Sequence, residues 1–174
     1  MQQLIKLIFE FFSIILLVLG VVVALVTYPS GRGTQGITIS ENLYRWISLL
    51  GAGVVGVYVF FAHAFFSSIT AKQIGWQTSP FQYEVAVANL GFGIRCIVAF
   101  SASYGFRLAS VIGISVWLWG DGLGHIRQMI VAKNFSPGNA GPWFWSDVLV
   151  PLLLIWLIIK LKNQQSRARP PFSD

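Results

Sequence analysis

Ionisable and amide side chains interrupt the apolar segments of this chain, and their chemistry needs an explanation. A charged group near the centre of a bilayer costs about 2.5–3.5 kcal/mol on insertion scales, so each one requires a partner or a function. The main candidates are two histidines, two carboxylates and one amide: His63, Glu84, Asn89, Asp121 and His125. Polar support for them is expected from Glu10, Arg95 and Arg127.

Two imidazoles and two carboxylates suit several kinds of chemistry if they meet. A divalent metal such as zinc or iron would be held by His63, Glu84, Asp121 and His125. Acidic and imidazole groups inside a membrane also suit a site for a proton or a small cation. A haem between the two histidines is geometrically feasible. The chain has only 2 histidines and no haem-attachment motif, which argues against haem.

A purely structural interpretation accounts for the same residues. Glu84 would pair with Arg127, Asp121 with His125 or Asn89, and the third segment's arginine, Arg95, with a backbone carbonyl or a carboxylate of another helix. Such pairs would fix the register of neighbouring helices and perform no reaction. The residue types alone leave this interpretation and the binding interpretations open.

The composition places these residues in a membrane protein. Of the 174 residues, 55% are hydrophobic and 10% are charged, whereas soluble domains carry about 25% charged residues. This composition excludes a soluble enzyme, a secreted toxin and a disordered chain. The single cysteine, Cys96, excludes a disulfide framework and a cysteine-cluster metal site.

Apolar runs of about 20 residues predict an all-α, polytopic membrane bundle with five transmembrane helices. The last run is short and crosses only if its helix begins near Trp143, just after Pro142; otherwise four helices cross. The whole chain, residues 1–174, is expected to form one integral membrane domain, with 162–174 as a basic, flexible cytoplasmic tail. The expected helices cover about 4–28, 43–69, 81–103, 106–132 and 143–161.

The expected helices bring the candidate residues to one depth. A hairpin of the third and fourth helices, centred near residue 105, puts Asn89 level with Asp121 and Glu84 level with the turn that holds His125. A turn near residue 75 brings His63 to a similar depth. We therefore expect a polar cluster in one leaflet, between helices two, three and four.

The basic residues predict an orientation. The net charge is +6, and four basic residues lie beside the last apolar run: Lys160, Lys162, Arg167 and Arg169. Loops rich in Lys and Arg stay in the cytoplasm, which favours a cytoplasmic C-terminus and, after five crossings, an outside N-terminus. The tail would contact anionic lipid headgroups. This placement beside a hydrophobic run disfavours nucleic acid as a partner.

Several short motifs resemble those of a bacterial family of small polytopic inner-membrane proteins with no assigned activity. They are Ile74-Gly75-Trp76, Ser79-Pro80-Phe81-Gln82 followed by Glu84, Asn89-Leu90-Gly91, and Gly120-Asp121 with His125. The resemblance covers about residues 58–131 and implies a location in the bacterial inner membrane. It implies no reaction.

Three functions remain open from the sequence. The first, which the sequence favours because five short helices leave little room for an alternating-access carrier, is an accessory or scaffold protein. Its polar cluster would hold the bundle together or dock a larger membrane complex or a second copy. The second is a small carrier of a proton, a metal or a cation. The third is a metal- or haem-dependent redox enzyme, which the absence of known catalytic motifs disfavours.

Overall fold

The apolar runs fold into helices, the structure in which a segment satisfies its own backbone groups without water. The computed structural model describes residues 2–28 and 37–168, and within these residues it contains helices and no strands. The elements are α1 (Gln2–Val26), α2 (Ile39–Trp46), the π-helical η1 (Ile47–Val54), α3 (Val55–Phe65), α4 (Ser67–Ile74), α5 (Phe81–Ala99), α6 (Tyr104–Val131), α7 (Pro137–Ala140) and α8 (Pro142–Ala168).

Three stretches are both long and apolar enough to cross a membrane: Leu7–Val26, Ile39–Phe65 and Pro137–Ser166. Helices α5 and α6, with 19 and 28 residues, extend about 28 and 42 Å but carry more polar and charged side chains. The expected all-helical class is therefore confirmed. Length and hydropathy together select three helices in the described residues, rather than the five expected crossings.

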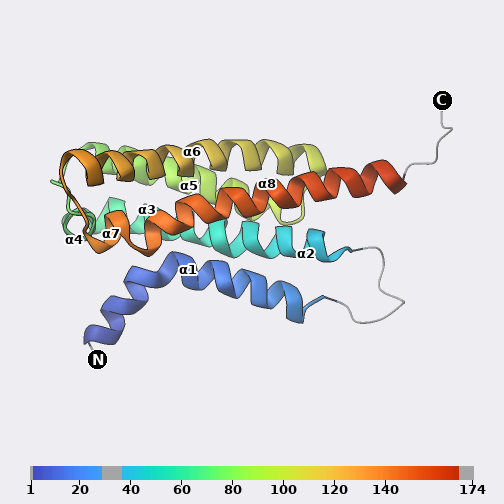
Figure 1. Cartoon of the computed structure of the whole chain (residues 1–174), viewed down its shortest axis with the longest axis horizontal. Helices are drawn as coiled ribbons and strands as arrows, with labels where there is room; N and C mark the ends of the chain where they lie inside the picture. The colour runs from blue at the N-terminus through green and yellow to red at the C-terminus, as the bar shows by residue number, and fades with distance from the viewer. Residues whose placement is uncertain (1, 29–36, 169–174) are drawn as a thin grey trace.

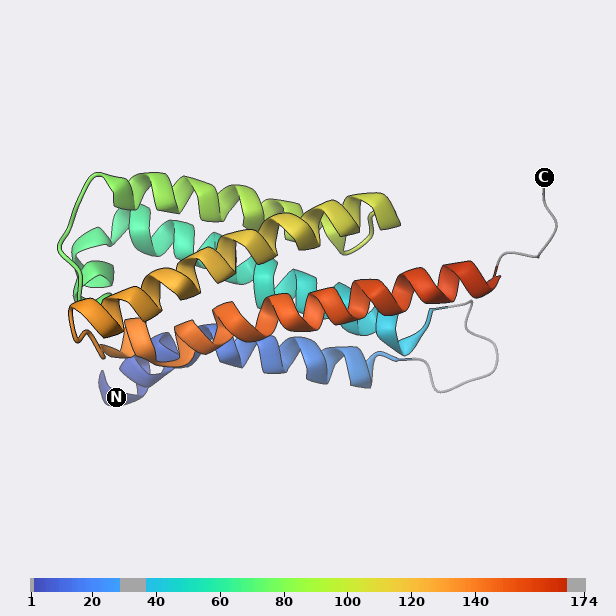
Figure 2. The same ribbon diagram turned by 45° about the horizontal axis from the view of Figure 1, so that its top comes forward.

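The long helices run side by side along one axis (Figures 1 and 2). The two short helices α4 and α7 lie at one end of this bundle, the end at which α6 finishes and α8 begins. The opposite end holds the start of α2, the connection between α5 and α6, and the last turns of α8. The chain thus has one end covered by short helices and one end formed by helix termini.

Glycines bring the central helices into close contact. A Cβ atom on Gly56 of α3 would lie 2.8 Å from the backbone oxygen of Asn89, and one on Gly93 of α5 would lie 2.9 Å from the backbone oxygen of Gly53. Small residues permit this backbone approach between membrane helices, where burial from water does not drive association. The α3–α5 contact therefore depends on the missing side chains.

The second expected helix, 43–69, is divided in the structure. It begins earlier, at Ile39, because the Thr38 hydroxyl accepts a hydrogen bond from the backbone N–H of Glu41 at 3.2 Å. It breaks at Phe66, whose φ of −126° and ψ of 34° are not helical. The following residues form α4, and the Thr70 hydroxyl donates to the Ala62 carbonyl at 2.8 Å across the break.

The boundaries of the later helices also differ from those expected. Helix α5 begins at Phe81 as expected but ends at Ala99, and α6 begins at Tyr104, so their connection is centred about three residues earlier than predicted. Helix α8 begins at Pro142 and continues to Ala168, beyond the expected end at residue 161. Residues 162–168 of the expected flexible tail are thus helical, and residues 169–174, with Arg169, lie outside the described residues.

Candidate functional site

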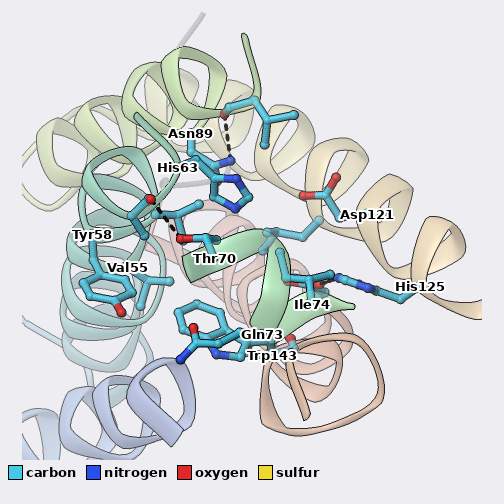
Figure 3. Close-up of a pocket in the computed structure, with 18 of the residues that line it drawn as sticks. Val55, Tyr58, His63, Thr70, Gln73, Ile74, Asn89, Asp121, His125 and Trp143 are labelled. Atoms are coloured by element: carbon cyan, nitrogen blue, oxygen red, sulfur yellow. Dashed lines mark hydrogen bonds and ion pairs between the residues drawn. The ribbon is translucent and has the colours of Figure 1, made fainter. Parts of the chain in front are cut away.

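A cavity of about 460 Å³ lies within the bundle, next to the end that α4 and α7 cover. Every long helical segment contributes side chains to its wall: α1, the α2–η1–α3 rod, α5, α6 and α8. Figure 3 shows side chains from α3, α4, α5, α6 and α8 surrounding it. The fold therefore surrounds one interior space with residues that are distant in the sequence.

The cavity is chemically divided. Toward the middle of the bundle its wall is apolar, with small and hydrophobic residues from η1, α5, α6 and α8: Gly51, Ala52, Phe92, Ile114, Leu118 and Val150. Toward the covered end it carries ionisable and hydrogen-bonding groups: Glu10, Tyr58, His63, Lys72, Gln73, Asn89, Asp121, His125 and Asp147. A space with one apolar part and a few grouped polar atoms is typical of a small-molecule site.

The polar end is built around His125, which is buried and held by Asn139 of α7. The amide nitrogen of Asn139 donates to two backbone oxygens, those of His125 at 3.2 Å and of Asn134 at 2.9 Å. Since carbonyl oxygens only accept, these two bonds fix the orientation of the amide. The amide oxygen then faces Nδ1 of His125 at 2.8 Å, so this ring nitrogen is the donor.

Two carboxylates accompany this histidine. Nε2 of His125 lies 3.6 Å from a carboxylate oxygen of Asp147 on α8. Asp147 packs against α6, since a Cβ atom placed on Gly122 would lie 3.9 Å from the Cβ atom of Asp147. Asp121, one turn before His125 on α6, lines the same cavity as Asp147. Asp121 makes no hydrogen bond or ion pair with any residue of the described ranges 2–28 and 37–168.

His63 of α3 also points into the cavity (Figure 3). Its residue is 8% exposed, and its Nδ1 atom is buried without a hydrogen-bond partner in the part of the chain that the structure describes. A buried polar atom of this kind is destabilising unless something else satisfies it.

Aromatic rings frame the same space. The Trp76 ring stacks on the His125 ring, with centroids 6.1 Å apart and planes inclined by 30°. The rings of Tyr58 and Trp143 stack at 5.9 Å and 13°. All four residues line the cavity, so ring faces and polar atoms lie around one volume.

The structure brings together some of the residues predicted from the sequence and separates others. His63, Asn89, Asp121, His125 and, as support, Glu10 line the cavity. Glu84 and Arg127 are exposed and absent from its wall. Arg95 also lies elsewhere, donating to the Ser110 carbonyl at 3.3 Å with its guanidinium 4.7 Å from the Phe92 ring centre.

The predicted depths and pairings need correction. Asn89 lies level with Trp117, whose indole N–H donates to the Asn89 amide oxygen at 3.3 Å, and not with Asp121. The reason is the earlier turn between α5 and α6, which shifts the register by about one helical turn. Nε2 of His125 lies against the carboxyl group of Asp147, at 3.6 Å, and not against that of Asp121.

Two further predictions concern ion pairs and metal. The expected pair of Glu84 and Arg127 does not occur among the ion pairs of the described residues. Within the same residues, no three His, Cys, Asp or Glu side chains are grouped so that they could hold a metal ion. The metal site expected from His63, Glu84, Asp121 and His125 is therefore not assembled in this structure.

Sequence reasoning missed two central residues. Asp147 is an acidic residue in the last apolar helix, and the criterion that selected Asp121 would have selected it too. Asn139 carries no comparable signal, since a lone asparagine in a Pro-Gly-Asn-Ala turn is ordinary. Its role follows from the position of α7 beside α6.

The fold and the cavity define a class: an all-helical protein with apolar helices that suit a membrane. Within this class, residues 10–167 match the model of a family of unknown function (DUF6790), and the chain belongs to that family. The predicted membership of an uncharacterised family is thereby confirmed. No curated protein and no solved structure matches the chain.

Proposed function

We propose that this protein is a polytopic membrane protein that binds a small amphipathic molecule in the cavity between its helices. The division of the cavity into an apolar part and a polar end carries the proposal. Its volume of about 460 Å³ lies in the range of ligand sites. Of the functions predicted from the sequence, this is closest to the small carrier that uses the polar cluster.

Two glycines support the proposal because they leave the cavity open. Gly120 and Gly124 line it, and a Cβ atom on either would meet nothing within 4 Å. Glycine inside a helix is about 1 kcal/mol less favourable than alanine. Their position on the cavity wall, where alanine would fit without a clash, is consistent with space kept for a ligand.

The membrane arrangement is part of the same proposal. Helices α5 and α6 would cross together with the three apolar helices, giving five crossings of a bacterial inner membrane. The end with the helix termini carries Arg45, Arg107, Lys160, Lys162 and Arg167, against Lys6, Lys72, Arg127 and Lys133 at the covered end. This asymmetry favours a cytoplasmic C-terminus and an outward-facing cavity end. The C-terminal basic residues would then contact anionic lipid headgroups.

A cysteine-labelling experiment tests the orientation. The native Cys96 is 1% exposed, so added cysteines report alone when a membrane-impermeant maleimide is applied to intact cells. Ser68→Cys at the covered end and Asn163→Cys in α8 both replace exposed residues. We expect labelling at position 68 and protection at 163; the reverse pattern would invert the proposed topology.

A cavity-filling variant tests binding. Gly124→Leu extends into the open volume, whereas Gly91→Leu, its control, adds the same side chain at an exposed site on α5 that is outside the cavity wall. Binding of 1-octanol is measured by calorimetry on protein in lipid nanodiscs, with empty nanodiscs subtracted. We expect Gly124→Leu to abolish protein-dependent binding and Gly91→Leu to retain it. Equal binding by both variants would reject the cavity as the site.

The accessory or scaffold role stays a prediction, as does a partner complex or a second copy. Both concern the outer surface of the bundle, and the cavity variants leave that surface unchanged. A scaffold whose cavity binds nothing would give no protein-dependent heat with 1-octanol in the unmodified chain. The calorimetry thus separates the two functions.

A further inference from the structure

We infer that the polar end of the cavity takes a primary ammonium group carried on a hydrocarbon body. The inference rests on the proposed function and adds the chemical class of the ligand. It depends on three acceptors from two helices, namely Asp121, Nε2 of His125 and Asp147, which we term the acceptor cluster.

The orientation of Asn139 gives the cluster its character. Because Nδ1 of His125 donates to Asn139, the other ring nitrogen of the neutral imidazole is a bare acceptor. It lies 3.6 Å from a carboxyl oxygen of Asp147, which is longer than a hydrogen bond, so neither atom satisfies the other. Asp121, which lines the same cavity, adds further oxygen atoms without a protein partner among the described residues. The three groups therefore require donors, and preferably a positive charge, from a molecule that enters the cavity.

A second observation points to a ligand independently of the acidic residues. His63 reaches the cavity from α3, on a different helix, and is 8% exposed with Nδ1 unpaired among the described residues. In Figure 3 the His63 and Asp121 side chains point into the same volume. A bound ligand that forms a hydrogen bond with this imidazole would explain why the buried group has no partner within the protein.

The charged groups around the cavity favour a cation. Among the described residues, the wall around the acceptor cluster holds the acidic side chains of Asp121 and Asp147, whereas the ammonium-bearing residue of the wall, Lys72, is exposed. The aromatic residues Trp76 and Trp143, which line the same end, can also contact a cation. An anionic head would meet repulsion at this end of the cavity.

The shape of the site distinguishes an ammonium from a metal ion. Among the described residues no group of three His, Cys, Asp or Glu side chains has the closeness that a metal requires. A primary ammonium has three N–H donors and reaches acceptors at longer distances. The apolar wall formed by Ala52, Phe92, Ile114 and Leu118 continues from the cluster and would cover the hydrocarbon body.

Matched ligands test the inference. n-Octylamine, 1-octanol and octanoate share one hydrocarbon chain and differ in the head, and each is titrated into the full-length protein in zwitterionic nanodiscs with empty nanodiscs subtracted. The variants are Asp147→Asn and Asp121→Asn, which keep side-chain size, and the control is Glu84→Gln, an exposed residue outside the cavity wall. Binding of 1-octanol reports whether each variant keeps an intact cavity.

We expect the unmodified protein to prefer octylamine to octanol by about tenfold or more, as for a hydrogen bond to a charged group. Each Asp→Asn change should remove this preference while octanol binding persists, and Glu84→Gln should leave it unchanged. Equal affinity for all three ligands, abolished by Gly124→Leu, would overturn the ammonium inference and leave the proposed function standing. If Gly124→Leu changes the binding of none of the three ligands, both the ammonium inference and the proposed function are overturned.

Discussion

The prediction that most directly tests the site concerns Asn139, the residue that orients His125. Asn139 is 0% exposed and makes three hydrogen bonds through its amide. Replacement by leucine preserves approximate volume and removes all three bonds. The imidazole Nδ1 of His125 and the backbone oxygens of His125 and Asn134 then lose a buried partner, and the cover formed by α7 loses its connection to α6.

The magnitude follows from these bonds. Leaving a buried donor or acceptor unpaired costs about 1–3 kcal/mol, and neighbouring losses add incompletely. We therefore expect Asn139→Leu to destabilise the bundle by about 2–4 kcal/mol. For a chain of this size that corresponds to a fall of about 5–15 °C in the melting temperature. The measurement is thermal unfolding in detergent, followed by circular dichroism.

An isosteric variant separates hydrogen bonding from packing. Asn139→Asp can still accept from His125, but it presents a carboxylate oxygen to the two backbone oxygens that the amide nitrogen now contacts. It should destabilise the protein at neutral pH at least as much as leucine does. The control is Asn163→Leu, an exposed position on α8. If Asn139→Asp melts with the unmodified protein, the amide orientation, and with it the assigned tautomer of His125, is wrong.

Three further predictions concern the frame around the cavity. Gly56→Val should destabilise the bundle by about 2 kcal/mol through overpacking, because the added Cβ overlaps the α5 backbone. The control Gly91→Ala adds a Cβ in open space and should leave the melting temperature unchanged. Equal melting temperatures for the two variants would refute this prediction. Arg107→Met should lower the free energy of unfolding by about 2–3 kcal/mol, because it removes the hydrogen bonds to the carbonyls that end α5. The control Arg127→Met, at an exposed residue, should leave the melting temperature unchanged. Equal losses of stability in the two variants would contradict the role assigned to Arg107. Cys96 is buried and should resist maleimide until the bundle unfolds. Gly56→Val, which destabilises the bundle, should therefore speed the modification of Cys96. Fast labelling of Cys96 in the native protein would contradict its burial.

Much of the fold was predictable because hydrophobic length and backbone satisfaction determine it. The apolar runs and the Pro142 start gave the helical class and the beginning of α8. The start of α5 at Phe81 was also predicted correctly; Pro80 is its N-cap, and no side chain caps the helix. The Gln82 amide donates to the Ser67 carbonyl of α4 at 3.1 Å. The break at Phe66 that allows this contact has no glycine or proline to predict it.

The depth of the site residues was predictable to within about one helical turn, but the direction of their side chains was not. Counting residues along helices placed His63, Asn89, Asp121 and His125 near one end, and all four line one cavity. It did not show which way each side chain points. Glu84 is five residues before Asn89, which turns it about 140° around α5, and it is exposed. The helix that supplies Asp147 was left out of the expected cluster, although its packing against α6 depends on the same kind of small residue, Gly122, that the sequence contains.

The polar side chains at the two ends of the bundle differ in how they are paired. At the end with the helix termini, the guanidinium of Arg107 donates to the Ala99 and Phe100 carbonyls and to the carboxylate of Glu41, which also pairs with Arg45 at 2.6 Å. These three side chains, Arg107, Glu41 and Arg45, thus pair with one another or with the backbone, as a structural role requires.

At the covered end, some polar side chains have no hydrogen-bond partner within the described residues. Asp121 and Nδ1 of His63 have no hydrogen-bond partner in the described residues, although Asn139 beside them is fully bonded. A polar cluster that served only to hold helices together would be expected to pair its own members, as Arg107 and Glu41 do. The unpaired Asp121 and His63 at the cavity wall therefore support the proposal that the cavity binds a ligand.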